Sequence, residues 1–183
     1  MEFQGKTVVT KDGGTVVLRA PDPERDAEKM VRYLPEVLGE THFMLREPEE
    51  WQVTVEEERR ILERSLANEN ELLIFVEADG EIVGSCNVSF MNRNRTRHRA
   101  NLGIVLRKAY WNRGIGTAMM QALIGEARKR EGVVQVELQY IEGNSRARAL
   151  YEKMGFRITG ILPDAIQLKD GTLLNEYHMI LKL

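Results

Sequence analysis

The sequence has a single cysteine and no long apolar run. Cys86 alone leaves no disulfide to form within the chain, and no secretory signal pattern opens it, so we expect a cytoplasmic protein. No apolar stretch reaches the roughly eighteen residues of a membrane-spanning helix, so no membrane role is expected. The 26 Lys and Arg residues are balanced by 28 Asp and Glu residues, and the formal net charge of -2 does not favour binding to nucleic acid.

Internal repeats, low-complexity segments and breaks in composition are missing as well. A chain of 183 residues is long enough for one well-buried core and short for two domains. We therefore expect a single domain over residues 1–183.

Asp-Gly pairs mark three expected hairpin turns. Asp12, Asp79 and Asp170 are each followed by glycine, and such pairs supply the positive φ angles that tight turns need. Segments rich in β-branched and aromatic residues flank these pairs and predict strands at residues 6–10, 15–19, 71–78, 81–90 and 171–183.

Two amphipathic helices are expected between the first two hairpins. The first covers residues 23–38, with Pro23 suited to a first helical turn and Pro35 expected to kink the helix or end it early. The second covers residues 54–68, where Thr54 and Glu57 have the spacing of a capping box.

The second half of the chain alternates between strand and helix patterns. Strands are expected at residues 98–106, 133–140 and 156–162, with helices at 114–130 and 145–154 between them. This order predicts parallel neighbours joined by right-handed crossovers. Together with the antiparallel hairpins, it predicts an α/β fold, more closely an α+β mixed sheet, flanked by helices.

A glycine-rich turn opens the first of these two helices. Glycines in the run Arg113–Ala118 (RGIGTA) let an anion approach the main chain, where free N–H groups and the helix dipole favour a phosphate. No P-loop pattern is present, and Met119 stands where a dinucleotide fingerprint needs its third glycine. On its own this run is also compatible with a tight turn that only serves packing.

A second motif lies downstream, with Asn144, Ala147, Leu150, Tyr151, Lys153, Gly155 and Phe156 at fixed spacing. Together with residues 111–116, this segment resembles the GNAT superfamily of acetyl-CoA-dependent N-acetyltransferases, in both the order and the separation of the two motifs. Trp111 departs from the pattern, since the family usually has Gln or Arg there. The resemblance implies a GNAT-like fold, with a central, mostly antiparallel sheet and splayed parallel strands 4 and 5.

The resemblance also implies acetyl-CoA as the acyl donor, with no metal. The pyrophosphate would lie on the turn, and Asn144 would contact the cofactor as the cap of its helix. Backbone groups of the strand before the turn would pair with the pantetheine amides as an added strand does. The implied residues are Ile104, Val105, Leu106, Arg113, Gly114, Ile115, Gly116, Thr117, Ala118 and Asn144.

Transfer to an amine needs proton transfers, because a free primary amine with a pKa near ~10 is mostly protonated at neutral pH. Tyr151 stands at the family's position for the acid that protonates the departing thiolate. For the base, the position that carries Glu in some members holds Gln139, so Glu137 on the same side of the strand is the first candidate. Glu142, His98 and a water chain without a dedicated base are the alternatives.

The acceptor site depends on pattern alone. Glu40 and Glu47, in the segment that joins the first two helices, could recognise an ammonium group, and His98 is a further candidate substrate-binding residue. Phe43, Met44 and Trp51 in and beside this segment are expected to pack the two helices together.

We expect an N-acetyltransferase that acts on a small-molecule primary amine of the amino acid or polyamine type. A protein N-terminal or lysine acetyltransferase is one alternative, and a non-catalytic acyl-CoA-binding module is the other, since position 139 lacks a carboxylate. The resemblance is also compatible with a homodimer.

Overall fold

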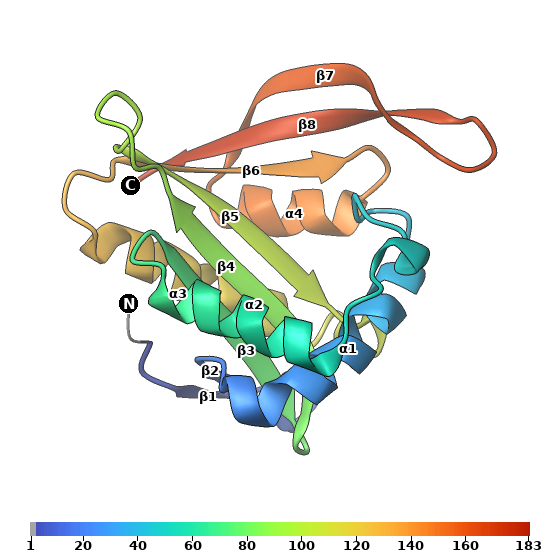
Figure 1. Ribbon diagram of the computed structural model, residues 1–183. Helices are drawn as coiled ribbons and strands as arrows, with labels where there is room; N and C mark the ends of the chain where they lie inside the picture. The colour runs from blue at the N-terminus through green and yellow to red at the C-terminus, as the bar shows by residue number, and fades with distance from the viewer. Residues whose placement is uncertain (1–2) are drawn as a thin grey trace.

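The computed structural model describes residues 3–183, in which one eight-stranded sheet carries helices on both faces (Figure 1). The strands are β1 (Lys6–Val9), β2 (Thr15–Arg19), β3 (Glu71–Ala78), β4 (Glu81–Phe90), β5 (Arg99–Leu106), β6 (Gln135–Ile141), β7 (Arg157–Gln167) and β8 (Leu173–Lys182). The helices are α1 (Pro23–Gly39), α2 (Val55–Ala67), α3 (Ile115–Lys129) and α4 (Ser145–Lys153), with 3₁₀ turns η1 (Pro48–Glu50) and η2 (Lys108–Tyr110).

The sheet has the order β1-β2-β3-β4-β5-β6-β8-β7, and every pair is antiparallel except β5 and β6. This confirms a mixed, mostly antiparallel sheet, but the parallel strands are the fifth and sixth in chain order and not strands 4 and 5. The expected parallel pairing of the last two strands in the alternating half is wrong. β8 lies between β6 and β7, because Met179 of β8 is fully buried in the core while most of β7 is exposed.

The parallel pair separates soon after it forms. β5 and β6 pair only over Arg99–Asn101 and Gln135–Glu137, and beyond these residues the strands diverge (Figure 1). Since β5 continues to Leu106 and β6 to Ile141, the divergence leaves a gap in the middle of the sheet with strand edges on both sides.

Helix boundaries follow local capping. Asp22 caps α1, and the expected capping box of Thr54 and Glu57 begins α2. The expectation that Pro35 ends the first helix early is wrong, since α1 runs through it to Gly39. Tyr33 and Val37 are both buried against the sheet on either side of Pro35, and this burial offsets the lost backbone hydrogen bond.

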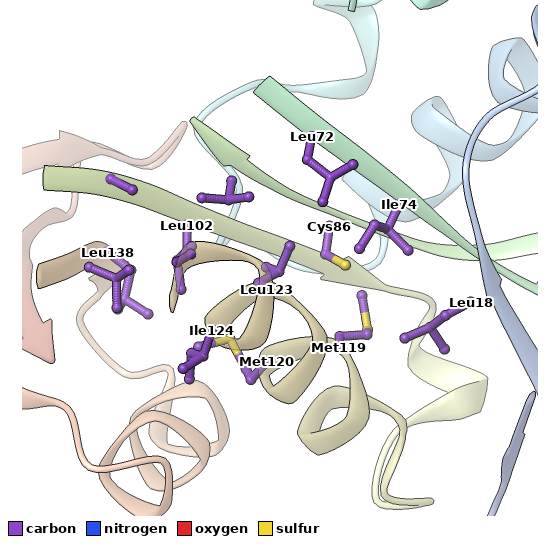
Figure 2. Packing of buried hydrophobic residues seen from close by; sticks show 14 of the residues in the cluster. Leu18, Leu72, Ile74, Cys86, Leu102, Met119, Met120, Leu123, Ile124 and Leu138 are labelled. Carbon is purple, nitrogen blue, oxygen red and sulfur yellow. The ribbon is translucent and has the colours of Figure 1, made fainter. Parts of the chain in front are cut away.

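The main core lies between the sheet and α3. The apolar side of α3 faces side chains of β2 to β6 (Figure 2). The labelled residues are Leu18, Leu72, Ile74, Cys86, Leu102, Met119, Met120, Leu123, Ile124 and Leu138. The opposite face of the sheet carries a smaller cluster in which Tyr33 of α1 and Leu62 of α2 pack with Phe75 of β3. The gap between β5 and β6 therefore opens toward a different helix layer on each side.

Candidate active site

A cavity of about 890 Å³ occupies the gap between β5 and β6. Its walls come from these two strands, from α4 and from the turn before α3. Thr41, Phe43, Met44 and Leu45, which follow α1, line it as well. The segment after α1 thus lines a cleft, and Phe43 and Met44, which were expected to pack two helices together, contribute to the cavity wall.

The glycine-rich turn lies at one end of this cavity. Gly114 caps α3 with a φ of 87°, a left-handed conformation that side chains rarely adopt. The first N–H groups of a helix have no partner within it, so those that follow Gly114 are available to an anion. Gly114, Gly116 and Thr117 line the cavity, whereas the side chains of Ile115 and Ala118 are buried in the core.

Gly116 permits close packing of α3 on α4. A Cβ atom added at Gly116 would lie 3.1 Å from Cδ2 of Leu150, closer than most Cβ contacts allow. Gly116 is therefore required for the packing of the two helices, whereas Gly114 is required for the left-handed backbone conformation.

The side chain of Arg113 does not line the cavity. Its guanidinium lies 3.1 Å from Asp12 in the β1–β2 turn and covers the ring of Tyr110 at 5.1 Å. The backbone carbonyl of Arg113 accepts a hydrogen bond from the N–H of Lys11 at 3.0 Å. Arg113 therefore fastens the β1–β2 turn to the glycine-rich turn and is not one of the residues that line the cavity.

Two cationic side chains lie at the same end of the cavity, and a third lines it from the end of α4. Lys11 lies beside Gly114, with its Cγ 3.6 Å from where a Cβ of that glycine would be. The guanidinium of Arg146 stacks 4.0 Å above the ring of Trp111, and Lys153 follows on the same face of α4. All three line the cavity. Trp111, the departure from the family pattern, thus holds an arginine beside the turn.

Asn144 caps α4, as its place in the motif suggested. Its Oδ1 accepts a hydrogen bond from the N–H of Ala147 at 3.1 Å, and the residue lines the cavity. The cap places the first turn of α4, including Arg146, against the cavity.

The edge of β5 along the gap has free backbone groups. Arg107 N–H donates to Val83 and Met91 N–H donates to the carbonyl of Arg99, so odd-numbered residues of β5 direct their backbone groups toward β4. Ile104 and Leu106 therefore direct their backbone N–H and C=O groups into the gap, while Val105 directs its groups toward β4. The carbonyl of Leu106 accepts a hydrogen bond from Nε1 of Trp111 at 2.8 Å, which leaves its N–H on the open side.

Tyr151 lines the cavity from the α4 side of the sheet and is 7% exposed. Its ring lies against Tyr140 and Phe156, with centroids 6.4 and 6.2 Å away. Burial raises the pKa of the Tyr151 hydroxyl from 10.0 to about 12, so the phenol stays protonated at neutral pH and can donate a proton. Cys86 also lines the cavity, but burial raises the pKa of its thiol to about 12, so it is not a thiolate nucleophile.

The structure does not bring Glu137 into this cavity. Its carboxylate forms a two-pronged pair with the guanidinium of Arg99, with Nη2 2.8 Å from both oxygens. Glu137 instead lines a smaller cavity of about 380 Å³, together with Thr159 and His178. Gln139 lines both cavities, so a proton path from the large cavity to Glu137 would have to pass Gln139.

The three residues expected to bind substrate lie apart. Glu40 lines the large cavity, where its carboxylate accepts a hydrogen bond from the N–H of Lys108. Glu47 lies outside it and pairs with Lys169 of the β7–β8 turn at 3.1 Å. His98 is exposed before the start of β5, at the end of the strand away from the glycine-rich turn.

Lys11 and Glu176 reach the cavity without a signal in the sequence pattern. Lys11 is in a hairpin turn a hundred residues from the glycine-rich turn, and Glu176 is on the last strand. Only the pairing of distant segments brings them to the site. Arg146 lies inside the Asn144 motif, and its stacking on Trp111 could have been suggested by the unusual residue at position 111.

Comparison with known proteins agrees with this geometry. The sequence model of the acetyltransferase (GNAT) family matches residues 38–156. An L-amino acid N-acetyltransferase of Escherichia coli (strain K12) is 31% identical over 101 residues, which are 55% of this chain. The match spans 62% of that relative's length.

Among solved structures, a GNAT-family acetyltransferase from Streptococcus pneumoniae superposes with a TM-score of 0.85 at 28% identity, over 92% of this chain and 99% of that one. The Salmonella typhimurium protein yncA, solved with its cofactor acetyl-CoA, shares the fold with a TM-score of 0.76 at 18% identity, over 92% of this chain and 94% of that one. The chain belongs to the acetyltransferase (GNAT) family.

Proposed function

We propose that this protein is an N-acetyltransferase that moves the acetyl group of acetyl-CoA to the primary amine of a small molecule. The observation that carries the proposal is the cavity in the gap between β5 and β6, which joins a left-handed glycine turn, a free strand edge and a buried tyrosine. The proposal takes residues 1–183 as one such domain, because strands of a single sheet extend from Lys6 to Lys182.

The cavity suits acetyl-CoA at three points. The turn at Gly114 leaves helix N–H groups open where a Cβ would obstruct an anion, and Lys11, Arg146 and Lys153 add positive charge for its phosphates. The backbone edge at Ile104 and Leu106 can pair with pantetheine amides as an extra strand would. Asn144 lines the same cavity at the start of α4.

When bound, acetyl-CoA supplies an acetyl group on a thioester. Tyr151, held protonated by its burial, would donate the phenolic proton to the departing sulfur while the amine nitrogen bonds the acetyl carbon. The nitrogen then loses its remaining extra proton, which can restore Tyr151. This assignment explains why a tyrosine with a raised pKa lines the cavity without a hydrogen-bond partner among the described residues.

The segment after α1 supports a small acceptor over a protein. Phe43 lies against the loop before α4, 3.7 Å from where a Cβ of Gly143 would be, so this segment reaches the β6–α4 loop (Figure 1). A polypeptide acceptor needs an open groove beside the strands. The E. coli relative is named as an acetyltransferase of L-amino acids, which are small acceptors.

The test is a screen of amino acids, polyamines, aryl alkylamines and lysine-containing or free N-terminal peptides with acetyl-CoA, following the release of free thiol. Turnover with small amines and not with peptides is the expected result. Turnover with peptides alone would replace the small-molecule acceptor with a protein. Tight acetyl-CoA binding without turnover of any acceptor would mean a non-catalytic binding module.

A further inference from the structure

Charge is distributed unevenly along the large cavity. The cationic side chains among its described lining residues are Lys11, Arg146 and Lys153. Lys11 and Arg146 lie beside the glycine-rich turn, and Lys153 lies at the end of α4. The lining carboxylates are Glu40 and Glu176. Each uses one oxygen within the protein, since Glu40 accepts a hydrogen bond from the backbone N–H of Lys108 and Glu176 lies beside His178. Their places in the cavity therefore decide which of them an amine can meet, and Glu176 is the one on the β8 side.

Glu176 lies on the face of the sheet opposite to Tyr151. It pairs with Ile141 across β6 and β8, and paired residues of antiparallel strands share a face. Val105 on this face packs with Tyr33 of α1, whereas Tyr151 belongs to the core on the α3 and α4 side. An amine that enters from the α1 side therefore meets Glu176 at the gap, and Tyr151 lies beyond the gap where the sulfur leaves.

The surroundings of Glu176 are polar. Its Oε1 lies 2.9 Å from Nε2 of His178, which pairs with Gln139 across the strands. Gln139 in turn accepts a hydrogen bond from Asn101 of β5 at 3.4 Å. The side chain of Glu176 is 18% exposed, so its charge is only partly solvated and would be stabilised by an ammonium group.

We propose that Glu176 binds the ammonium group of the acceptor and takes its proton, and that the acceptor is an amine without a carboxylate beside the amino group. The proposal rests on the acetyltransferase activity proposed above. It narrows the acceptor class because an amino acid would bury its own α-carboxylate at this end of the cavity. No Lys or Arg among the described lining residues faces this end, and a buried carboxylate without a cationic partner is costly. The Arg99 guanidinium lines the smaller cavity and is already paired with Glu137.

The proton balance is complete with these groups. The ammonium gives one proton to Glu176, and the freed amine forms the new N–C bond as the C–S bond breaks. The sulfur takes the phenolic proton of Tyr151, and the nitrogen returns a proton to that phenolate. Glu176 then releases its proton to solvent, so that an ammonium and a thioester give an amide, a thiol and one proton.

The first test compares matched pairs that differ only in the α-carboxylate, tyramine with tyrosine and agmatine with arginine. We expect the amine of at least one pair to be acetylated with a kcat/KM at least tenfold above that of its amino acid. Equal or better turnover of the amino acids would overturn the proposal that the acceptor lacks a carboxylate beside its amino group. A wild-type protein that acetylates none of the screened amines would overturn the proposed function and this inference with it.

The second test is Glu176→Gln, which keeps the size of the side chain and removes its charge. With the best amine, kcat/KM should fall by roughly 10²–10⁴, the range for a lost acid or base group, while the Kd of acetyl-CoA changes less than twofold. Glu176→Asp should recover part of the lost rate, and an unchanged Tm would show that both variants fold. Activity of Glu176→Gln within twofold of the wild type would overturn the role of Glu176.

Glu152→Gln is the matched control, since this exposed glutamate of α4 pairs with Arg148 outside the cavity and should keep full activity. Glu137→Gln separates the two base assignments. A loss of rate in Glu137→Gln without a loss in Glu176→Gln would assign the base to Glu137 and overturn the proposal. The wild-type activity in the same assay keeps this outcome distinct from a failure of the proposed function.

Discussion

Tyr151 lies at the boundary between the core and the cavity, and this position determines what its hydroxyl can do. The ring packs with Tyr140 and Phe156, and the burial that raises its pKa to about 12 keeps it an acid at all physiological pH values. A tyrosine in water would be similarly protonated, but it would not be held beside the gap. The structural role and the proposed chemical role thus depend on the same burial.

Tyr151→Phe separates these two roles, because it keeps the ring and removes the hydroxyl. With both substrates saturating, we expect kcat to fall by roughly 10²–10⁴ while acetyl-CoA affinity and Tm stay close to the wild type. Stopped-flow or steady-state measurement of thiol release provides the rate. A kcat within about twofold of the wild type, in a step shown to be chemistry, would mean that the thiolate leaves unaided.

Arg146 offers a second test at the residue scale, because Trp111 holds its guanidinium beside the glycine-rich turn at 4.0 Å. Arg146→Met keeps much of the stem and removes the charge, so we expect the Kd of acetyl-CoA to rise about tenfold, equivalent to about 1.4 kcal/mol. Calorimetric titration measures it. Arg148→Met on the same helix is the control, since Arg148 pairs with Glu152 and does not line the cavity. An equal effect of both variants would point to net charge rather than a specific contact.

At the scale of elements, local signals located the helix caps and the hairpins, while long-range pairing determined the rest. Asn144 and Thr54 could be recognised as caps because a cap depends on residues within one turn. The insertion of β8 between β6 and β7 could not be recognised from the sequence, because it depends on which distant strand buries more apolar surface. The same limit explains why Glu176 was missed and why the Arg99 partner of Glu137 was not foreseen.

Helix α2 contains a carboxylate that its amphipathic pattern does not explain. Glu58 is 1% exposed, and its Oε2 has no hydrogen-bond partner among the described residues. Burial raises the pKa of Glu58 from 4.5 to about 7. Between these two values the folded protein keeps a proton that the unfolded chain has released, so its stability should fall as the pH rises through this window.

Glu58→Gln removes this titration while keeping the shape of the protonated side chain. In urea unfolding at pH 8, the free energy of unfolding of the variant should exceed that of the wild type by roughly 1–3 kcal/mol. This difference should shrink toward pH 5. Glu63→Gln, on the exposed side of the same helix, should change stability little at either pH. A pH-independent difference for Glu58→Gln would contradict the raised pKa.

At the scale of the whole molecule, the cavity is assembled from segments that lie far apart in the chain. Lys11 comes from the first hairpin, Phe43 from the segment after α1, and Glu176 from the last strand. The ion pair of Lys169 with Glu47 also ties the last hairpin to the segment after α1. Unfolding any of these parts dismantles the site, so a ligand that needs all of them binds only the folded protein. None of the helices described in residues 3–183 is long and apolar enough to cross a membrane.

Acetyl-CoA should therefore raise the Tm, and NAD should not, because the turn lacks the third glycine of a dinucleotide fingerprint. At a concentration of one hundred times Kd, binding adds about 2.7 kcal/mol, which for a chain of this size shifts Tm by about 5–10 °C. Differential scanning fluorimetry measures both ligands. Gly114→Val should abolish the shift, since a branched Cβ at a φ of 87° is strained and covers the helix N–H groups. A shift with NAD alone would restore the dinucleotide interpretation, and a full acetyl-CoA shift in Gly114→Val would place the phosphates away from this turn.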